Sequence, residues 1–240
     1  MKLMNLAGIV GIILLIISLI FVGFSFISLY SKSTAEVGDI SETESSLTNS
    51  IFSMILGIVS VILALFFYFG FVKMGEYAES KLLKVSSWLI ISSILLFIFL
   101  MIFGVFYINA VTKEIMEGSS GGSSSFMFFL IIALMIAVFY VISNILFNVG
   151  LIKVSNRVKF SKSAGIIGII LLIMLVFLIV LSIFVFISIM STLFEGGSSL
   201  GVAGGMMILL VVLYIGVIIL GEVYLLLMSL SLLNASKNFE

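Results

Sequence analysis

Long apolar runs alternate along this chain with short polar segments. Six runs lie at residues 6–30, 51–72, 85–108, 126–152, 164–190 and 206–233, and none of them contains Lys or Arg. About 20 helical residues span the hydrocarbon core of a bilayer, so each run is long enough to cross it. The pattern predicts an all-α integral membrane protein with six transmembrane helices in a single domain over 1–240.

Composition supports a membrane location and narrows the function. The chain is 63% hydrophobic and 9% charged, whereas soluble domains carry about 25% charged residues. Its formal net charge of zero gives no support for binding nucleic acid. The chain has no Cys and no His, which excludes thiolate chemistry and removes the commonest general base and metal ligand. We therefore expect no metal, no cofactor and no enzymatic activity.

The basic residues gather in alternate polar segments. One side of the predicted bundle would carry nine of the eleven, namely Lys2, Lys73, Lys81, Lys84, Lys153, Arg157, Lys159, Lys162 and Lys237. The other side has only Lys32 and Lys113, among several acidic residues. Lys and Arg in short loops favour the cytoplasmic face, so this distribution predicts a multi-pass cell-membrane protein with both termini in the cytoplasm.

An internal repeat organises the sequence. Ala-Gly-Ile-Val-Gly-Ile-Ile-Leu-Leu-Ile at 7–16 recurs as Ala-Gly-Ile-Ile-Gly-Ile-Ile-Leu-Leu-Ile at 164–173, and Gly-Phe-Val-Lys at 70–73 matches Gly-Leu-Ile-Lys at 150–153. Duplication explains these matches better than chance similarity between apolar helices. We predict three tandem parallel helical hairpins, at roughly 1–84, 85–162 and 163–240, with the middle copy the most divergent.

Small residues in the repeated segments predict helix contacts. In lipid, small side chains mark the faces where helix backbones approach closely. Ala7 and Gly11 lie on one stripe of the first predicted helix, and Ala164 and Gly168 are their counterparts on the fifth. We expect these stripes to form contacts inside the bundle, and the alternative is that they pack against a second copy in a homo-oligomer or against another membrane protein. The sequence does not separate these alternatives.

Glu222 interrupts the sixth apolar run near the predicted bilayer midplane. A charge at that depth costs several kcal/mol, and such residues usually face the bundle interior. No basic residue lies within any span, so burial favours the neutral acid as a hydrogen-bond donor. The fourth helix offers partners at four-residue spacing. We predict a polar seam between these helices, made of Glu222, Asn144, Asn148, Tyr140 and Ser229, with Tyr214 on the same face.

Two functions are compatible with such a seam. Interhelical hydrogen bonds would fix the packing register, at about 1 kcal/mol each. A proton or cation relay, or a substrate site, would instead make the protein a small-solute or ion transporter. The absence of Pro argues against the discontinuous helices that many coupled transporters use. The sequence therefore favours a non-enzymatic structural or interaction component, with a transporter as the alternative.

A belt of basic residues offers a third function. The bilayer is the expected partner, and anionic lipid headgroups could be bound on the cytoplasmic side at about 1 kcal/mol per residue near the surface. The candidate headgroup ligands are Lys81, Lys84, Lys153, Arg157, Lys159 and Lys162. The segments on the opposite side, at 31–50, 117–125 and 195–205, are acidic or rich in Ser and Gly, which is typical of flexible linkers.

The Ala-Gly-Ile-x-Gly-Ile-Ile-Leu-Leu-Ile opening, repeated after a basic loop, resembles small multi-pass archaeal and bacterial membrane proteins grouped as a domain of unknown function. The similarity covers two stretches of about ten residues. It implies a prokaryotic, archaeal origin and tandem hairpins. The resemblance implies no activity, and it assigns no functional residues in this chain.

Overall fold

The structure is a computed structural model. It describes the backbone of residues 2–34, 42–116, 122–195 and 200–238, and the side chains of 2–22, 55–104, 107, 131–187 and 209–238. Six α-helices fill these ranges: α1 (Lys2–Thr34), α2 (Glu42–Tyr77), α3 (Lys81–Met116), α4 (Gly122–Lys153), α5 (Ser161–Glu195) and α6 (Leu200–Asn238).

All six helices are long and apolar enough to cross a membrane. Large apolar side chains lie on their outer surfaces, and Leu134 and Met135 are each 66% exposed. A soluble protein rarely leaves such a surface to water. These are the properties of a membrane-embedded, multi-pass protein.

Each helix is longer than its apolar run. The segments at 31–50, 117–125 and 195–205 were expected to be linkers, yet α1 continues to Thr34, α2 begins at Glu42, α4 at Gly122 and α6 at Leu200. The linker prediction is wrong for these helical parts. Once an apolar run has nucleated a helix, each added residue gains a backbone hydrogen bond, so Ser, Glu and Gly extend it past the last apolar side chain.

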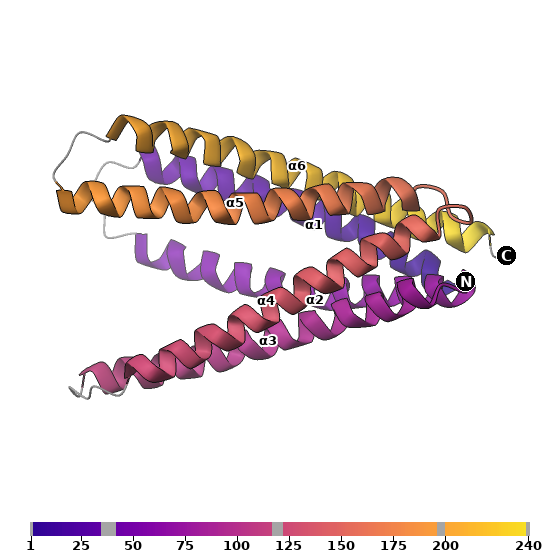
Figure 1. The fold of residues 1–240 in the computed structure, drawn as a ribbon, viewed down its shortest axis with the longest axis horizontal. Coiled ribbons are helices and arrows are strands. Elements are labelled where there is room, and N and C mark those ends of the chain that lie inside the picture. Colours follow the sequence, from indigo (N-terminus) through magenta and orange to yellow (C-terminus); the bar gives the residue numbers. More distant parts are fainter. Residues whose placement is uncertain (1, 35–41, 117–121, 196–199, 239–240) are drawn as a thin grey trace.

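The helices form a closed ring in sequence order. Each one packs against the next, α1 and α6 pack against each other, and α2 also touches α6 across the ring. Figure 1 shows the helices close together at the end that holds both termini, whereas α3 and α4 diverge from α1, α5 and α6 toward the other end. We call the packed end, with the 77–81 and 153–161 connections, the basic end.

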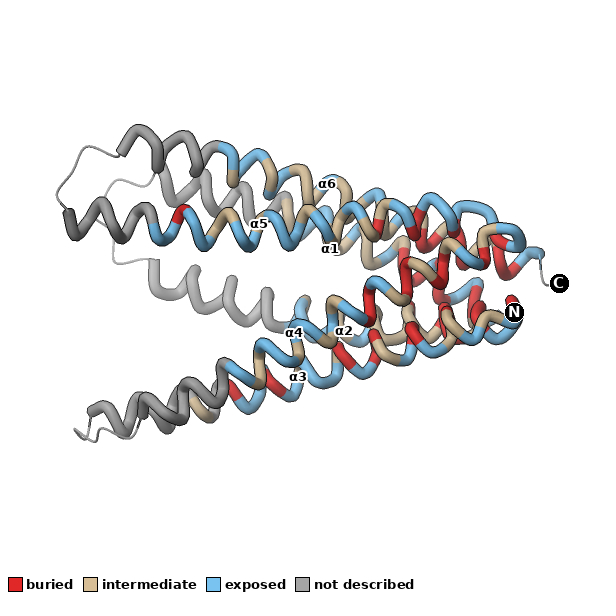
Figure 2. The backbone as a smooth tube through the Cα atoms, in the orientation of Figure 1, coloured by how far each residue is buried: buried red, intermediate tan, exposed pale blue. Residues whose placement is uncertain are grey.

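The buried core lies toward the basic end. Figure 2 shows the buried residues concentrated there. Its centre is a cluster of aromatic rings in edge contact, in which Phe147 of α4 lies 5.5 Å from Tyr68 and 5.1 Å from Phe71 of α2, while Phe67 lies 5.3 Å from Phe71, measured between ring centroids. Edge-to-face geometry is the arrangement that such rings prefer. The cluster therefore joins two helices that are not neighbours in the ring.

Hydrogen bonds hold the connections at the basic end. α2 ends in a Schellman motif, in which Ser80 N donates to Gly75 O at 2.9 Å and Glu79 takes a left-handed φ of 55°. The Arg157 guanidinium donates to Ala78 O at 3.0 Å, and the backbone N–H of Lys159 donates to Asn234 Oδ1, also at 3.0 Å. The 153–161 connection thus ties the α2–α3 turn to the end of α6.

Close backbone approach depends on glycine at two helix contacts. A Cβ built at Gly11 of α1 would clash with Ser229 of α6 and with the ring of Phe67 of α2. A Cβ at Gly168 of α5 would clash with the Asn148 amide of α4 and lie 2.7 Å from the ring of Tyr224 of α6. Each glycine therefore lies where three helices meet.

Candidate functional site

Glu222 forms a hydrogen bond with α1. Ser18 Oγ donates to Glu222 Oε1 at 2.5 Å, between residues 204 positions apart in the sequence. The other carboxyl oxygen, Oε2, is buried and has no hydrogen-bond partner among the described residues. A buried polar atom without a partner costs free energy, and each such atom in a folded protein calls for an explanation. Glu222 is therefore a buried acid with only one of its two carboxyl oxygens satisfied among the described residues.

Glu222 lines a cavity of about 740 Å³ between α1, α2 and α6. Phe67 and Met228 belong both to the buried core and to the lining, so the core closes the cavity on that side. The polar lining groups are Ser18, Ser60, Glu222, Tyr68 and Tyr224. Most other lining side chains are aliphatic, including Leu14, Ile17, Val61, Ala64, Ile218 and Leu225. Ligand sites commonly have this volume and this apolar lining with a few polar groups.

The predicted seam between the fourth and sixth helices is wrong as a single network. α4 is not a ring neighbour of α6, since it packs against α3 and α5. Glu222 bonds to Ser18 instead of Asn144. Successive residues on a helix are about 100° apart, so depth alone did not fix the direction in which Glu222 points.

One hydrogen bond does join α4 to α6. Tyr224 Oη donates to Asn148 Oδ1 at 2.8 Å, and Asn148 is 2% exposed. This bond passes beside Gly168 of α5, whose missing side chain leaves room for both residues. Tyr224 lies two positions beyond Glu222, about 200° around the helix. The two side chains therefore form hydrogen bonds with different helices, Glu222 with α1 and Tyr224 with α4.

The remaining members of the predicted seam do not bond to Glu222. The Asn144 amide donates to Tyr140 O at 2.9 Å, and Ser229 donates to Leu225 O at 2.8 Å, each within its own helix. The side chains of Tyr140 and Tyr214 are exposed, at 44% and 55%. Back-bonding of this kind satisfies a buried amide or hydroxyl without any partner helix.

The predicted packing residues lie at helix contacts. Ala7 and Ala164 are fully buried, and Gly11 and Gly168 are buried at the three-helix contacts described above.

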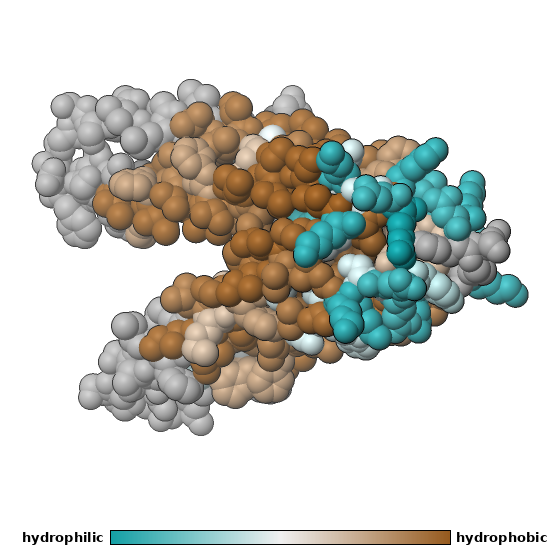
Figure 3. All heavy atoms as spheres, turned by 45° about the vertical axis from the view of Figure 1, so that its right-hand side comes forward, coloured by the Kyte–Doolittle hydropathy of each residue, from teal (hydrophilic) through white to brown (hydrophobic). Residues whose placement is uncertain are grey.

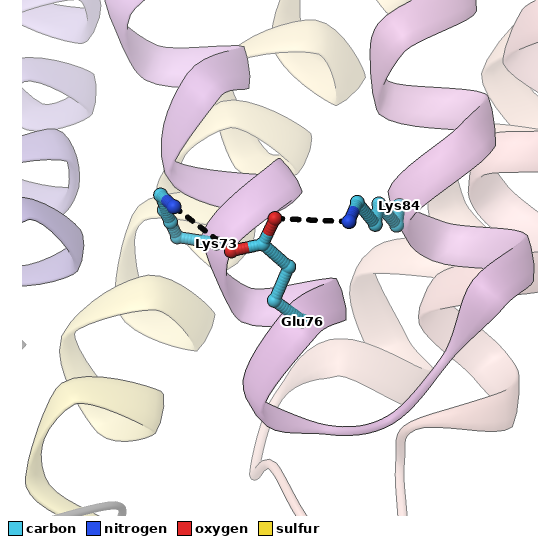
Figure 4. A network of polar contacts seen from close by, with 3 residues as sticks. All are labelled: Lys73, Glu76 and Lys84. Atoms are coloured by element: carbon cyan, nitrogen blue, oxygen red, sulfur yellow. Dashed lines mark hydrogen bonds and ion pairs between the residues drawn. The ribbon is translucent and has the colours of Figure 1, made fainter.

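The nine basic side chains that the structure describes lie at one end of the molecule. Figure 3 shows hydrophilic residues gathered at that end and apolar residues over the spans. Figure 4 shows Glu76 between two lysines, with Lys73 Nζ at 2.8 Å and Lys84 Nζ at 3.0 Å from its carboxyl oxygens. Arg157 lies 3.7 Å from Glu79. The other candidate headgroup ligands, Lys81, Lys153, Lys159 and Lys162, have no ion pair with the acidic residues that the structure describes.

The cavity was not predicted from the sequence, although two signals pointed toward it. Ser18 lies seven positions after Gly11, on the same small-residue stripe of α1, and a hydroxyl on such a stripe can donate to a buried acid. Tyr224 lies two residues from Glu222 on the other side of α6, and it lines the cavity while bonding to α4.

Comparison with protein-family models, with curated proteins and with solved structures finds no match. The resemblance noted from the repeated opening therefore stays a prediction.

Proposed function

We propose that this protein binds an apolar or amphipathic small molecule inside the membrane, in the cavity at Glu222. The observation that supports the proposal is the largely apolar cavity of about 740 Å³ with the Glu222 carboxyl group in its wall. A bundle built only to fix helix packing would gain from filling this space, because empty volume loses dispersion contacts. The cavity therefore shifts our preference from a structural component to a small-solute binding protein or transporter.

The chemistry of the cavity favours binding over catalysis. Its polar groups are hydroxyls and one carboxyl. Among the described residues, no cluster of acidic side chains could hold a metal ion. The lining residues therefore supply contacts and a single acid, without the paired acid–base or nucleophile–base groups that hydrolytic chemistry needs.

Photolabelling in lipid nanodiscs tests this proposal. The probe is an uncharged ethylphenyl diazirine, which is small enough to enter the cavity. We expect saturable labelling of α2 within 56–68 and of α6 within 218–228, mapped by mass spectrometry, because both segments line the cavity. Gly57→Trp should abolish most of this labelling, since Gly57 lines the cavity, a Cβ there meets nothing within 4 Å, and an indole ring would occupy the space.

Ile62→Trp is the matched control. Ile62 lies on the same helix, is 61% exposed and does not line the cavity, so saturable labelling should be unchanged. Labelling that spreads evenly over all six helices, or that is the same in Gly57→Trp and wild type, would contradict a binding cavity.

We further propose that the ring is built from the three predicted hairpins. Gly11, Phe67 and Ser229 meet at one three-helix contact, and Gly168, Tyr224 and Asn148 meet at the other. Gly168 lies 157 positions after Gly11, and Tyr224 lies 157 positions after Phe67. In both places a glycine packs between the second helix of its own hairpin and the second helix of the preceding one, which supports duplication.

The charge distribution supports an orientation with the basic end in the cytoplasm, where the unpaired lysines would meet anionic headgroups. The chain has no native Cys, so single cysteines report topology cleanly. In intact cells, we expect cysteines at Ser45 and Ser120 to react with an impermeant maleimide and those at Ser80 and Ser155 to be protected. The opposite pattern would reverse the orientation, and labelling that requires an odd number of crossings would contradict the hairpins.

A further inference from the structure

We propose that the cavity at Glu222 selects a lipophilic amine in its protonated form, with the ammonium group against the Glu222 carboxyl and the apolar body in the remaining space. This inference rests on the proposed binding function and names its ligand class. The observation behind it is Glu222 Oε2, which is buried, has no described partner and belongs to a residue in the cavity wall.

The carboxyl group is half satisfied. Ser18 holds Oε1, which fixes the side chain on the α1 side of the cavity, and no described group donates to Oε2. No Lys or Arg is among the described residues that line the cavity. An ammonium N–H supplies both things that the site lacks, a hydrogen-bond donor and a positive charge, and charge-assisted hydrogen bonds are roughly twice as strong as neutral ones.

Aromatic rings favour an organic cation further. Phe67, Tyr68 and Tyr224 line the same cavity. A ligand cation over an aromatic face gains about 0.5–2 kcal/mol, with the larger values where water is excluded. The aliphatic side chains of the lining would pack against the hydrocarbon part of the ligand.

The two simpler occupants fit less well. An inorganic cation prefers a shell of oxygen ligands, about six for Mg²⁺ and six to eight for Ca²⁺, whereas the described wall of this cavity is mostly aliphatic and carries a single carboxyl group. A neutral hydrocarbon fills the space but leaves Oε2 without a donor. A lipophilic amine satisfies the volume, the apolar lining and the carboxyl together.

An isosteric pair of photoprobes tests this selection on the full chain in lipid nanodiscs. One probe is an aryl diazirine with an aminomethyl group, which is protonated at neutral pH. The other is the uncharged ethylphenyl diazirine, in which a methyl group replaces the ammonium. We expect half-saturation of cavity labelling by the amine at a concentration about tenfold or more lower than by the isostere, as one charge-assisted hydrogen bond predicts.

Glu222→Gln keeps the side-chain shape and removes the group that can carry a negative charge. We expect it to bring the two probes within about twofold of each other while labelling by the isostere stays at the wild-type level. The conservative Glu222→Asp keeps the carboxyl and should retain a preference for the amine.

Each outcome separates this inference from the binding function on which it rests. Equal half-saturation of the two probes in wild type overturns selection of an amine and leaves a neutral binding cavity. An amine preference that survives in Glu222→Gln overturns the role of Glu222. Failure of both probes to label 56–68 and 218–228 saturably contradicts the binding function itself.

Discussion

Replacing Gly168 with Leu is expected to lower the free energy of unfolding by about 3 kcal/mol or more, which would reduce the melting temperature by on the order of 10 °C. Even the first carbon of the new side chain would overlap the Asn148 amide and lie 2.7 Å from the Tyr224 ring. α4, α5 and α6 would all have to move apart. Gly11→Leu should have a similar effect, because its Cβ would clash with Ser229 and Phe67.

Gly57→Leu is the matched control for both changes. It places the same side chain in the middle of a helix, where a Cβ meets nothing within 4 Å. We expect its unfolding to stay close to that of wild type in detergent, monitored by circular dichroism. If Gly11→Leu and Gly168→Leu also melt like wild type, these glycines face lipid and the packing assignment is wrong.

The Tyr224–Asn148 hydrogen bond is expected to stabilise the bundle by about 1–2 kcal/mol. It is the described side-chain bond that joins α6 to α4, and it lies beside the α5 contact at Gly168. Tyr224→Phe and Asn148→Ala should each destabilise the protein. The double variant should cost less than the sum of the two, by about 1 kcal/mol, in a double-mutant cycle measured by denaturation in mixed micelles.

Tyr214→Phe provides the control for this cycle. Tyr214 lies on the same helix and is 55% exposed, so the loss of its hydroxyl should change the unfolding free energy by no more than about 0.5 kcal/mol. Additive effects of Tyr224→Phe and Asn148→Ala would show that the two side chains do not interact.

The helices could be predicted from hydropathy, whereas their ends could not. Apolar runs mark the part of each helix that lies in lipid, and every predicted run falls inside an observed helix. The helix ends are polar, and their extent depends on hydrogen bonds that a hydropathy pattern does not contain. The end of α2 is an example, because it is set by the left-handed backbone conformation of Glu79, a residue type that does not normally signal a helix end.

The candidate site could be predicted only in part. Glu222 was identifiable because a carboxyl group in an apolar run is rare. Its partner was not, since the order of helices around the ring decides whether α1 or α4 lies beside it. The cavity depends on the packing of three helices and on small residues such as Gly57 and Ala64, and a single sequence gives no measure of space left between helices.

A density map of the protein in lipid nanodiscs, with a rigid antibody fragment bound to aid alignment, tests the central claim most directly. The account predicts an open cavity between α1, α2 and α6 with the Glu222 carboxyl in its wall, and added density beside that carboxyl after incubation with the aminomethyl probe. A bundle in which α1, α2 and α6 close against one another and leave no space at Glu222 would contradict it.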